Sequence, residues 1–127
     1  MKAGFAGDDV PRTVFLTIFG WKKHSGVFVG MVSRNWWYGE EALARRYGLN
    51  LKCPFDNGVI SNWQNWDAME KIWHETFNLE LGVAPSEHAV LLTDNVFYPK
   101  ESKKRMTQID NIIVPYGSMI IQCGWPK

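Results

Sequence analysis

The sequence lacks the features of a disulfide scaffold and of a membrane protein. Its two cysteines, Cys53 and Cys123, form no CxxC pair and no cluster with metal-ligand spacing. A disulfide and two free thiols both remain open, and a reducing compartment favours free thiols. No apolar run is as long as a membrane span, and the N-terminus has no signal-peptide core. We therefore expect a cytoplasmic protein without a membrane partner.

An excess of charge of one sign is also missing. The formal net charge is +1 at pH 7, which gives no electrostatic reason to expect binding to nucleic acid. A basic helix is expected over residues 100–109, where Lys100, Lys103, Lys104 and Arg105 could contact phosphate. A solvated helix face is the favoured interpretation, because no aromatic or glycine-rich element accompanies these residues.

Catalytic and metal-binding motifs are absent as well. The sequence contains no GxxxxGK[ST], GxSxG or HExxH pattern. Asp8 and Asp9 read as turn residues, and His24 reads as a surface residue without other ligand types around it. His74 follows Glu70 by one helical turn and is interpreted as a surface pair. The residue pattern therefore predicts no metal site and no complete catalytic constellation.

What the chain does contain is a strong helical period over residues 67–81. Met69, Ile72, Trp73 and Phe77 recur at spacings of three and four, so they share one face. Trp66 continues this face toward the N-terminus. Seven tryptophans in so short a chain indicate heavy aromatic packing or some exposed apolar surface. We expect this helix to bury its aromatic face against a sheet or other helices.

The ends of this helix carry their own signals. Asn65 is predicted to cap its start, and Gly82, followed by Pro85, is predicted to stop its end. Asp67 and Lys71 lie four residues apart with the acid first, which is the favourable order on a helix surface.

Strands and further helices are expected on both sides of it. Residues 89–93 are continuously apolar, which predicts a strand buried on both faces. Residues 49–53 and 58–61 are expected to pair through a turn at 54–57. The other expected elements are a strand within 1–12, strands over 14–19 and 118–122, a helix over 40–47 and the helix over 100–109, where Met106 and Ile109 form a narrow apolar stripe. This alternation predicts a mixed α/β domain.

The residues themselves resemble the actin family. Segment 2–12 resembles the stretch after the family's first phosphate hairpin, and segment 24–31 is similar to the deoxyribonuclease-binding loop of the second subdomain. Further short matches follow in actin order at residues 51–54, 58–63, 69–74, 76–77, 83–85, 90–93, 99–100 and 106–109. The sequence departs from the family at Asn57, at a three-residue insertion over 64–66, and at Trp36, Trp37 and Tyr38, which are bulkier than usual.

The resemblance implies a partial actin-like fold of the ribonuclease-H-like, actin ATPase class, with a mixed sheet and flanking helices. Residues 1–127 are expected to form a single incomplete actin-like domain. It would begin after the family's first phosphate hairpin and end before the second. Residues 1–19 and 54–127 would be subdomain-1-like. Residues 20–53 would be subdomain-2-like, with an exposed loop. We expect this chain to be marginally stable, aggregation-prone or dependent on a partner.

Two positions are implied at the nucleotide. Lys2 matches the lysine that reaches the phosphates. Gln122 matches the glutamine that positions the attacking water, provided that a short deletion follows Ile109. Phosphoryl transfer needs a phosphate cradle, a bound Mg²⁺ and an oriented water together. We therefore expect no ATPase activity and no Mg-ATP cofactor for this chain alone, although the family binds Mg-ATP.

The resemblance also implies a partner-binding loop over residues 21–36. Its named contacts are His24, Val27, Phe28, Val29 and Met31, of which the last four are apolar without an obvious core to enter. They either dock on a partner or cover the local subdomain. Actin or actin-binding proteins are the partners implied, and the cytoskeleton is the implied location.

The expected function is that of an actin-like structural or interaction protein. One alternative is an ATP-binding, nucleotide-dependent filament subunit of which this is an incomplete chain. Another is the product of a degenerate gene copy with no selected function.

Overall fold

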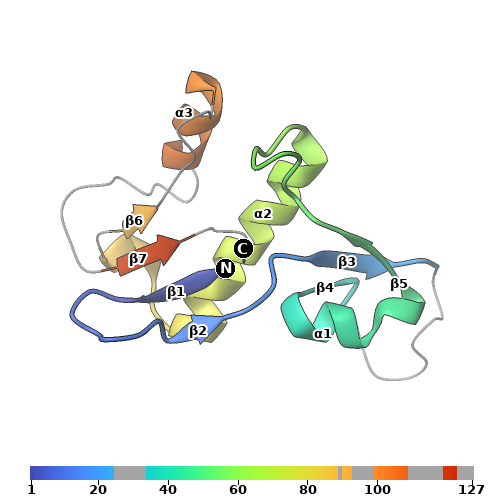
Figure 1. Ribbon diagram of the computed structural model, residues 1–127, viewed down its shortest axis with the longest axis horizontal. Helices are drawn as coiled ribbons and strands as arrows, with labels where there is room; N and C mark the ends of the chain where they lie inside the picture. Colours follow the sequence, from blue (N-terminus) through green and yellow to red (C-terminus); the bar gives the residue numbers. More distant parts are fainter. Residues whose placement is uncertain (25–33, 89, 93–98, 109–118, 123–127) are drawn as a thin grey trace.

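Two small sheets and one long helix dominate the computed structural model, which describes residues 1–24, 34–88, 90–92, 99–108 and 119–122 (Figure 1). The four-stranded sheet has the order β2-β1-β7-β6, and the three-stranded sheet has the order β4-β3-β5. The strands are β1 Lys2–Phe5, β2 Thr13–Val14, β3 Phe19–Lys22, β4 Trp36–Tyr38, β5 Leu49–Lys52, β6 Val90–Leu92 and β7 Met119–Gln122. The α-helices are α1 Gly39–Ala44, α2 Trp63–Glu75 and α3 Lys100–Gln108. Shorter turns are the 3-10 segments η1 Arg46–Gly48 and η3 Pro85–Glu87, and the π-helical η2 Thr76–Leu81.

The four-stranded sheet joins the two ends of the described chain. Strand β7 lies between β1, to which it is antiparallel, and β6, to which it is parallel. Ala3 stands opposite Ile121, and Val90 stands opposite Met119. Strand β7 therefore links a strand at the start of the chain to one about ninety residues further on. The combination of helices with a sheet of parallel and antiparallel strands confirms the mixed α/β class predicted from the sequence.

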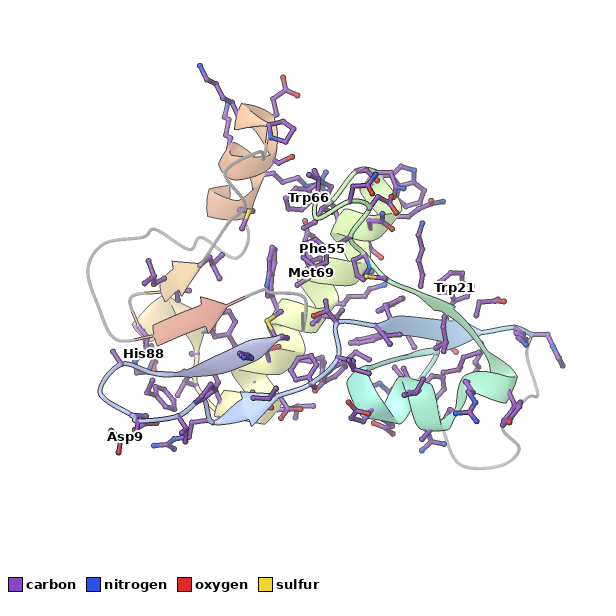
Figure 2. All side chains as sticks on the ribbon, in the orientation of Figure 1. Asp9, Trp21, Phe55, Trp66, Met69 and His88 are labelled. Carbon is purple, nitrogen blue, oxygen red and sulfur yellow. The ribbon has the colours of Figure 1, made fainter. Side chains whose placement is uncertain are left out.

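Helix α2 and the π-helical turn η2 that follows it cover one face of this sheet and bury the predicted residues. The side chains of Met69, Ile72, Trp73 and Phe77 are at most 2% exposed, and Trp66 is 5% exposed. They form one core cluster with Ala3 and Val90 of the sheet, with Phe19 of the other sheet, and with Phe55 in the connection before the helix (Figure 2). The helical period was thus a correct guide to the burial face, since spacings of three and four repeat on one side of a helix.

The start of α2 corrects the predicted cap. The helix begins at Trp63, and the side chain of Asn62 accepts a hydrogen bond from the backbone N–H of Asn65 at 2.8 Å. Asn65 is not the cap; it lies inside the first turn and is 1% exposed. Both residues are asparagines, so either could have served as the cap. The helix starts three residues earlier than predicted, because residues 63–65 are already helical.

The end of α2 is partly as predicted. Gly82 adopts a left-handed conformation with φ of 67° and stops the helix. The residues before it, Thr76–Leu81, form a π-helical turn instead of continuing the α-helix. Asp67 and Lys71 form the expected pair, with Lys71 Nζ at 2.9 Å from Asp67 Oδ2.

Two expected strands were wrong. The strand over 14–19 is broken, because β2 ends at Val14 and β3 begins at Phe19. The chain crosses between the two sheets at 15–18, where Phe15 N–H donates to the Met1 carbonyl at 3.0 Å. No strand forms over 58–61; only Asp56 and Val59 make an isolated bridge. Strand β5 pairs with β3 instead. Its partner therefore lies earlier in the chain, before α1, and not directly after the turn at 54–57.

Three smaller expectations also need correction. Strand β6 is buried on one face only, since Val90 is 2% exposed and Leu91 is 49% exposed. Glu70 does not pair with His74; it accepts from Arg105, while His74 Nδ1 lies 3.9 Å from Glu75. The predicted helix over 40–47 is α1 followed by η1. In α3 Met106 is buried as expected, and Ile109 lies outside the described residues.

Candidate functional site

The first candidate site is the segment between strands β3 and β4. The two strands pair antiparallel from Phe19 opposite Tyr38 to Trp21 opposite Trp36, and Lys22 N–H donates to the Asn35 carbonyl at 3.1 Å. The two ends of segment 23–34 are therefore held side by side at one end of the three-stranded sheet. Of the residues implied for partner binding, His24 is exposed. The other four, Val27, Phe28, Val29 and Met31, lie outside the described residues.

Strand β4 at the base of this segment was not predicted. The sequence signal for it was present, because three aromatic residues in succession favour a strand. Their side chains alternate between the two faces of the sheet. Trp36 and Tyr38 are half-buried on one face, and Trp37 is 1% exposed on the other.

A row of aromatic rings covers the face that carries Trp36 and Tyr38. Trp36 stacks on Phe19 with ring centroids 5.4 Å apart, and its centroid lies 6.3 Å from that of Tyr38. Phe15, from the crossing between the sheets, meets Tyr38 edge-on at 5.2 Å. Trp21 extends the row at 6.3 Å from Phe19 (Figure 2). We call Phe15, Phe19, Trp21, Trp36 and Tyr38 the aromatic row.

Two cations hold the aromatic row against the rest of the chain. Lys71 of α2 places its ammonium 5.7 Å from the Phe19 ring and 5.9 Å from the Trp36 ring. Arg34 places its guanidinium 4.6 Å from the Trp36 ring and donates from Nε to the Trp36 carbonyl at 2.7 Å. Cations over aromatic faces attract the ring quadrupole. The three-stranded sheet is thus attached to α2 by charge as well as by apolar contact.

The opposite face of the three-stranded sheet has its own small core. Trp37, Ala42 and Leu49 are each at most 2% exposed and form a separate cluster under α1. The guanidinium of Arg45 lies 5.5 Å from the Trp37 ring, and the ammonium of Lys22 lies 5.9 Å from it. Helix α1 therefore covers one face of this sheet, and α2 meets the other face at Phe19 and Trp36, while Trp21 on that face is 41% exposed.

The second candidate site concerns Lys2 and Gln122. Lys2 is exposed on β1, and the register places it opposite Gln122 on β7 and opposite Val14 on β2. The two positions implied at the nucleotide are thus brought together from opposite ends of the chain. Among the described residues, no group of three or more His, Cys, Asp or Glu side chains is placed to hold a metal ion.

The remaining chemistry-bearing residues have structural partners. Asp8 accepts from Arg12 Nε at 2.8 Å within the turn after β1, as its reading as a turn residue suggested. Cys53 carries a free, half-buried thiol, and Cys123 lies outside the described residues. Arg105 is not simply solvated: it donates to Glu70 and lies 5.1 Å from the Trp66 ring. Within the described ranges, no helix is both long and apolar enough to cross a membrane.

A comparison with known protein families gives one match. The family described as Actin matches residues 1–111 of the 127-residue chain. The chain belongs to the actin family. The match spans every described element from β1 to α3, which includes both sheets except β7. Strand β7 lies beyond the matched residues of this actin-family chain, yet it is an inner strand of the four-stranded sheet.

Proposed function

We propose that this actin-family chain is a cytoskeletal structural or interaction protein that binds actin or actin-binding proteins through the loop 21–36. The observation that carries the proposal is the pairing of β3 with β4, which fixes both ends of segment 23–34 at one end of the three-stranded sheet. A rigid base lowers the entropic cost of ordering a binding segment. The proposed location is the cytoplasmic cytoskeleton.

The proposed fold assignment follows the actin resemblance. Residues 20–53 would form the subdomain-2-like part, and residues 1–19 and 54–127 the subdomain-1-like part of a ribonuclease-H-like, actin ATPase fold. Supporting this division, β4, α1 and β5 lie within 20–53, and β3 begins one residue before it. The other sheet and helices α2 and α3 lie in the remaining ranges.

We further propose that the chain alone has no ATPase activity and carries no Mg-ATP cofactor. A lysine and a glutamine on neighbouring strands supply two contacts, whereas phosphoryl transfer needs a phosphate cradle, Mg²⁺ and an oriented water acting together. The alternative function, a nucleotide-dependent filament subunit, is favoured by one observation, the register that sets Lys2 opposite Gln122.

Co-sedimentation with actin filaments tests the proposed partner contact. The wild type is compared with a double variant, Val29→Asp with Met31→Asp, and with Val10→Asp, which adds one acid at a 70% exposed apolar position away from the loop. We expect the wild type and Val10→Asp to pellet with filaments and the double variant to remain in solution. Equal pelleting of all three proteins, or of none, would overturn the proposal.

A titration with Mg-ATP distinguishes the two functions. The proposed function expects no saturable binding at micromolar nucleotide. Saturable binding that is weakened by Lys2→Ala would support the nucleotide-dependent alternative, because Lys2 is the exposed cation at that position.

A further inference from the structure

Glu80 joins the two sheets through both oxygens of its carboxylate. The Thr13 hydroxyl on β2 donates to Glu80 Oε2 at 2.9 Å, and the Tyr38 hydroxyl on β4 donates to Glu80 Oε1 at 2.9 Å. One oxygen therefore serves the four-stranded sheet and the other serves the three-stranded sheet. Hydrogen bonds to an ionised carboxylate are stronger than those between neutral groups.

The π-helical turn η2 places Glu80 at this position. Its C-terminal Gly82 donates its N–H to the Phe77 carbonyl, five residues back, and the buried Thr76 hydroxyl donates to the Ile72 carbonyl at 2.7 Å. A π turn holds one residue more than an α turn, so the side chains that follow it are displaced around the helix axis. π turns often occur at functional sites.

The surroundings keep Tyr38 a hydrogen-bond donor. Burial raises the pKa of its phenol well above the ordinary value, and the hydrogen bond to Glu80 and the charges of Glu80 and Glu75 raise it further. The positive charge of Arg34 lowers the pKa of Tyr38 and so opposes these effects. Its guanidinium lies 5.9 Å from the Tyr38 ring and 3.9 Å from a Glu75 oxygen.

Glu80 itself is exposed to solvent, so water can replace both of its hydrogen bonds. Residues 15–18 join the two sheets covalently, and residues 53–62 join the three-stranded sheet to α2. The two sheets also share one apolar cluster, which holds Ala3 of β1 and Phe19 of β3, so the Glu80 contact is the solvent-accessible part of a larger interface.

We propose that Glu80 is a latch between the two sheets, closed by Tyr38 and Thr13, and that its opening lets the three-stranded sheet reorient relative to α2. Strands β3 and β4, between which the proposed binding loop lies in the sequence, move with that sheet. The latch is a property of the described fold and does not depend on which partner the segment binds.

The first test is hydrogen exchange of the full-length chain followed by mass spectrometry. The variants are Glu80→Gln, which keeps the shape of the side chain and removes one acceptor, and Tyr38→Phe, which removes one hydroxyl. Glu87→Gln at an exposed position in η3 is the matched control. We expect both test variants to exchange about three- to tenfold faster in β3 and β4, the size of one lost hydrogen bond, with β1 and the control unchanged.

The second test measures the distance between the sheets. Spin labels are attached at Val10→Cys and Tyr47→Cys, both highly exposed positions, after Cys53 and Cys123 are replaced by serine. The latch predicts a broader distance distribution in Glu80→Gln and Tyr38→Phe than in the parent protein. Unchanged exchange and unchanged distances in Tyr38→Phe, the mildest substitution, would overturn the proposal. Equal changes in Glu87→Gln, or faster exchange spread evenly over β1 and β3, would also overturn it.

Discussion

Arg105 of α3 donates a hydrogen bond to Glu70 of α2 at 3.3 Å, across 35 residues of sequence. The two side chains are 45% and 38% exposed, so solvent screens the pair. A double-mutant cycle of Arg105→Ala and Glu70→Ala should give a coupling free energy of about 0.2–1 kcal/mol. Urea denaturation at low and high salt measures it, and the coupling should fall as salt rises. A salt-independent coupling would contradict the screened pair.

The core face of α2 should tolerate little loss of volume. Met69 and Ile72 are both 0% exposed, so Met69→Ala or Ile72→Ala should lower the free energy of unfolding by about 2–5 kcal/mol. Leu79→Ala, at a 64% exposed position of η2, is the matched control and should change it by less than about 0.5 kcal/mol. Urea denaturation compares the three variants, and similar losses in all of them would contradict the observed burial.

The cap of α2 should depend on Asn62 and not on a residue within the helix. Asn62→Ala removes the acceptor for the Asn65 N–H and should cost about 0.5–2 kcal/mol of stability. Asn62→Asp keeps an acceptor oxygen and should retain most of that stability. Thermal melts of the two variants check the prediction, which fails if alanine and aspartate behave alike.

Tyr38 should make stability fall at alkaline pH. Its pKa is raised in the folded chain, while the unfolded chain ionises near the ordinary value of about 10. The unfolded state therefore releases its proton first, and the contribution of Tyr38 to stability is complete below about pH 10 and declines above it. Between about pH 10 and 12 the wild type should lose stability faster than Tyr38→Phe, as followed by urea denaturation. Tyr47→Phe is the exposed control, and parallel curves for wild type and Tyr38→Phe would count against the raised pKa.

Exposed apolar side chains should give the folded chain a dye-binding surface. Val14, Trp63, Leu79 and Leu91 are 49–70% exposed in the described part of the chain. Such side chains offer apolar surface to a dye or to a partner. We expect the native protein to bind a hydrophobic dye before the thermal transition. A sharp cooperative melt with no dye binding beforehand would contradict the expected marginal stability.

The Lys2–Gln122 pair and the Glu80 contact differed in how far the sequence could predict them. Lys2 and Gln122 were found from the resemblance, but their facing positions depend on β7 pairing with β1 across the whole chain. Nothing in the sequence indicated a specific contact for Glu80, because an acidic residue near the end of a helix is usually solvated. Only the π turn and the two sheets show that its oxygens have specific donors.

The sequence by itself determined the family, the buried face of α2 and the stop at Gly82. These are local properties, since helical spacing and a left-handed glycine depend on residues close together in the chain. The tertiary structure decided the strand order, the break at 15–18 and the insertion of β7 between β1 and β6. Strand pairing joins residues far apart in sequence, and a strand's own residues do not state which partner completes its hydrogen bonds.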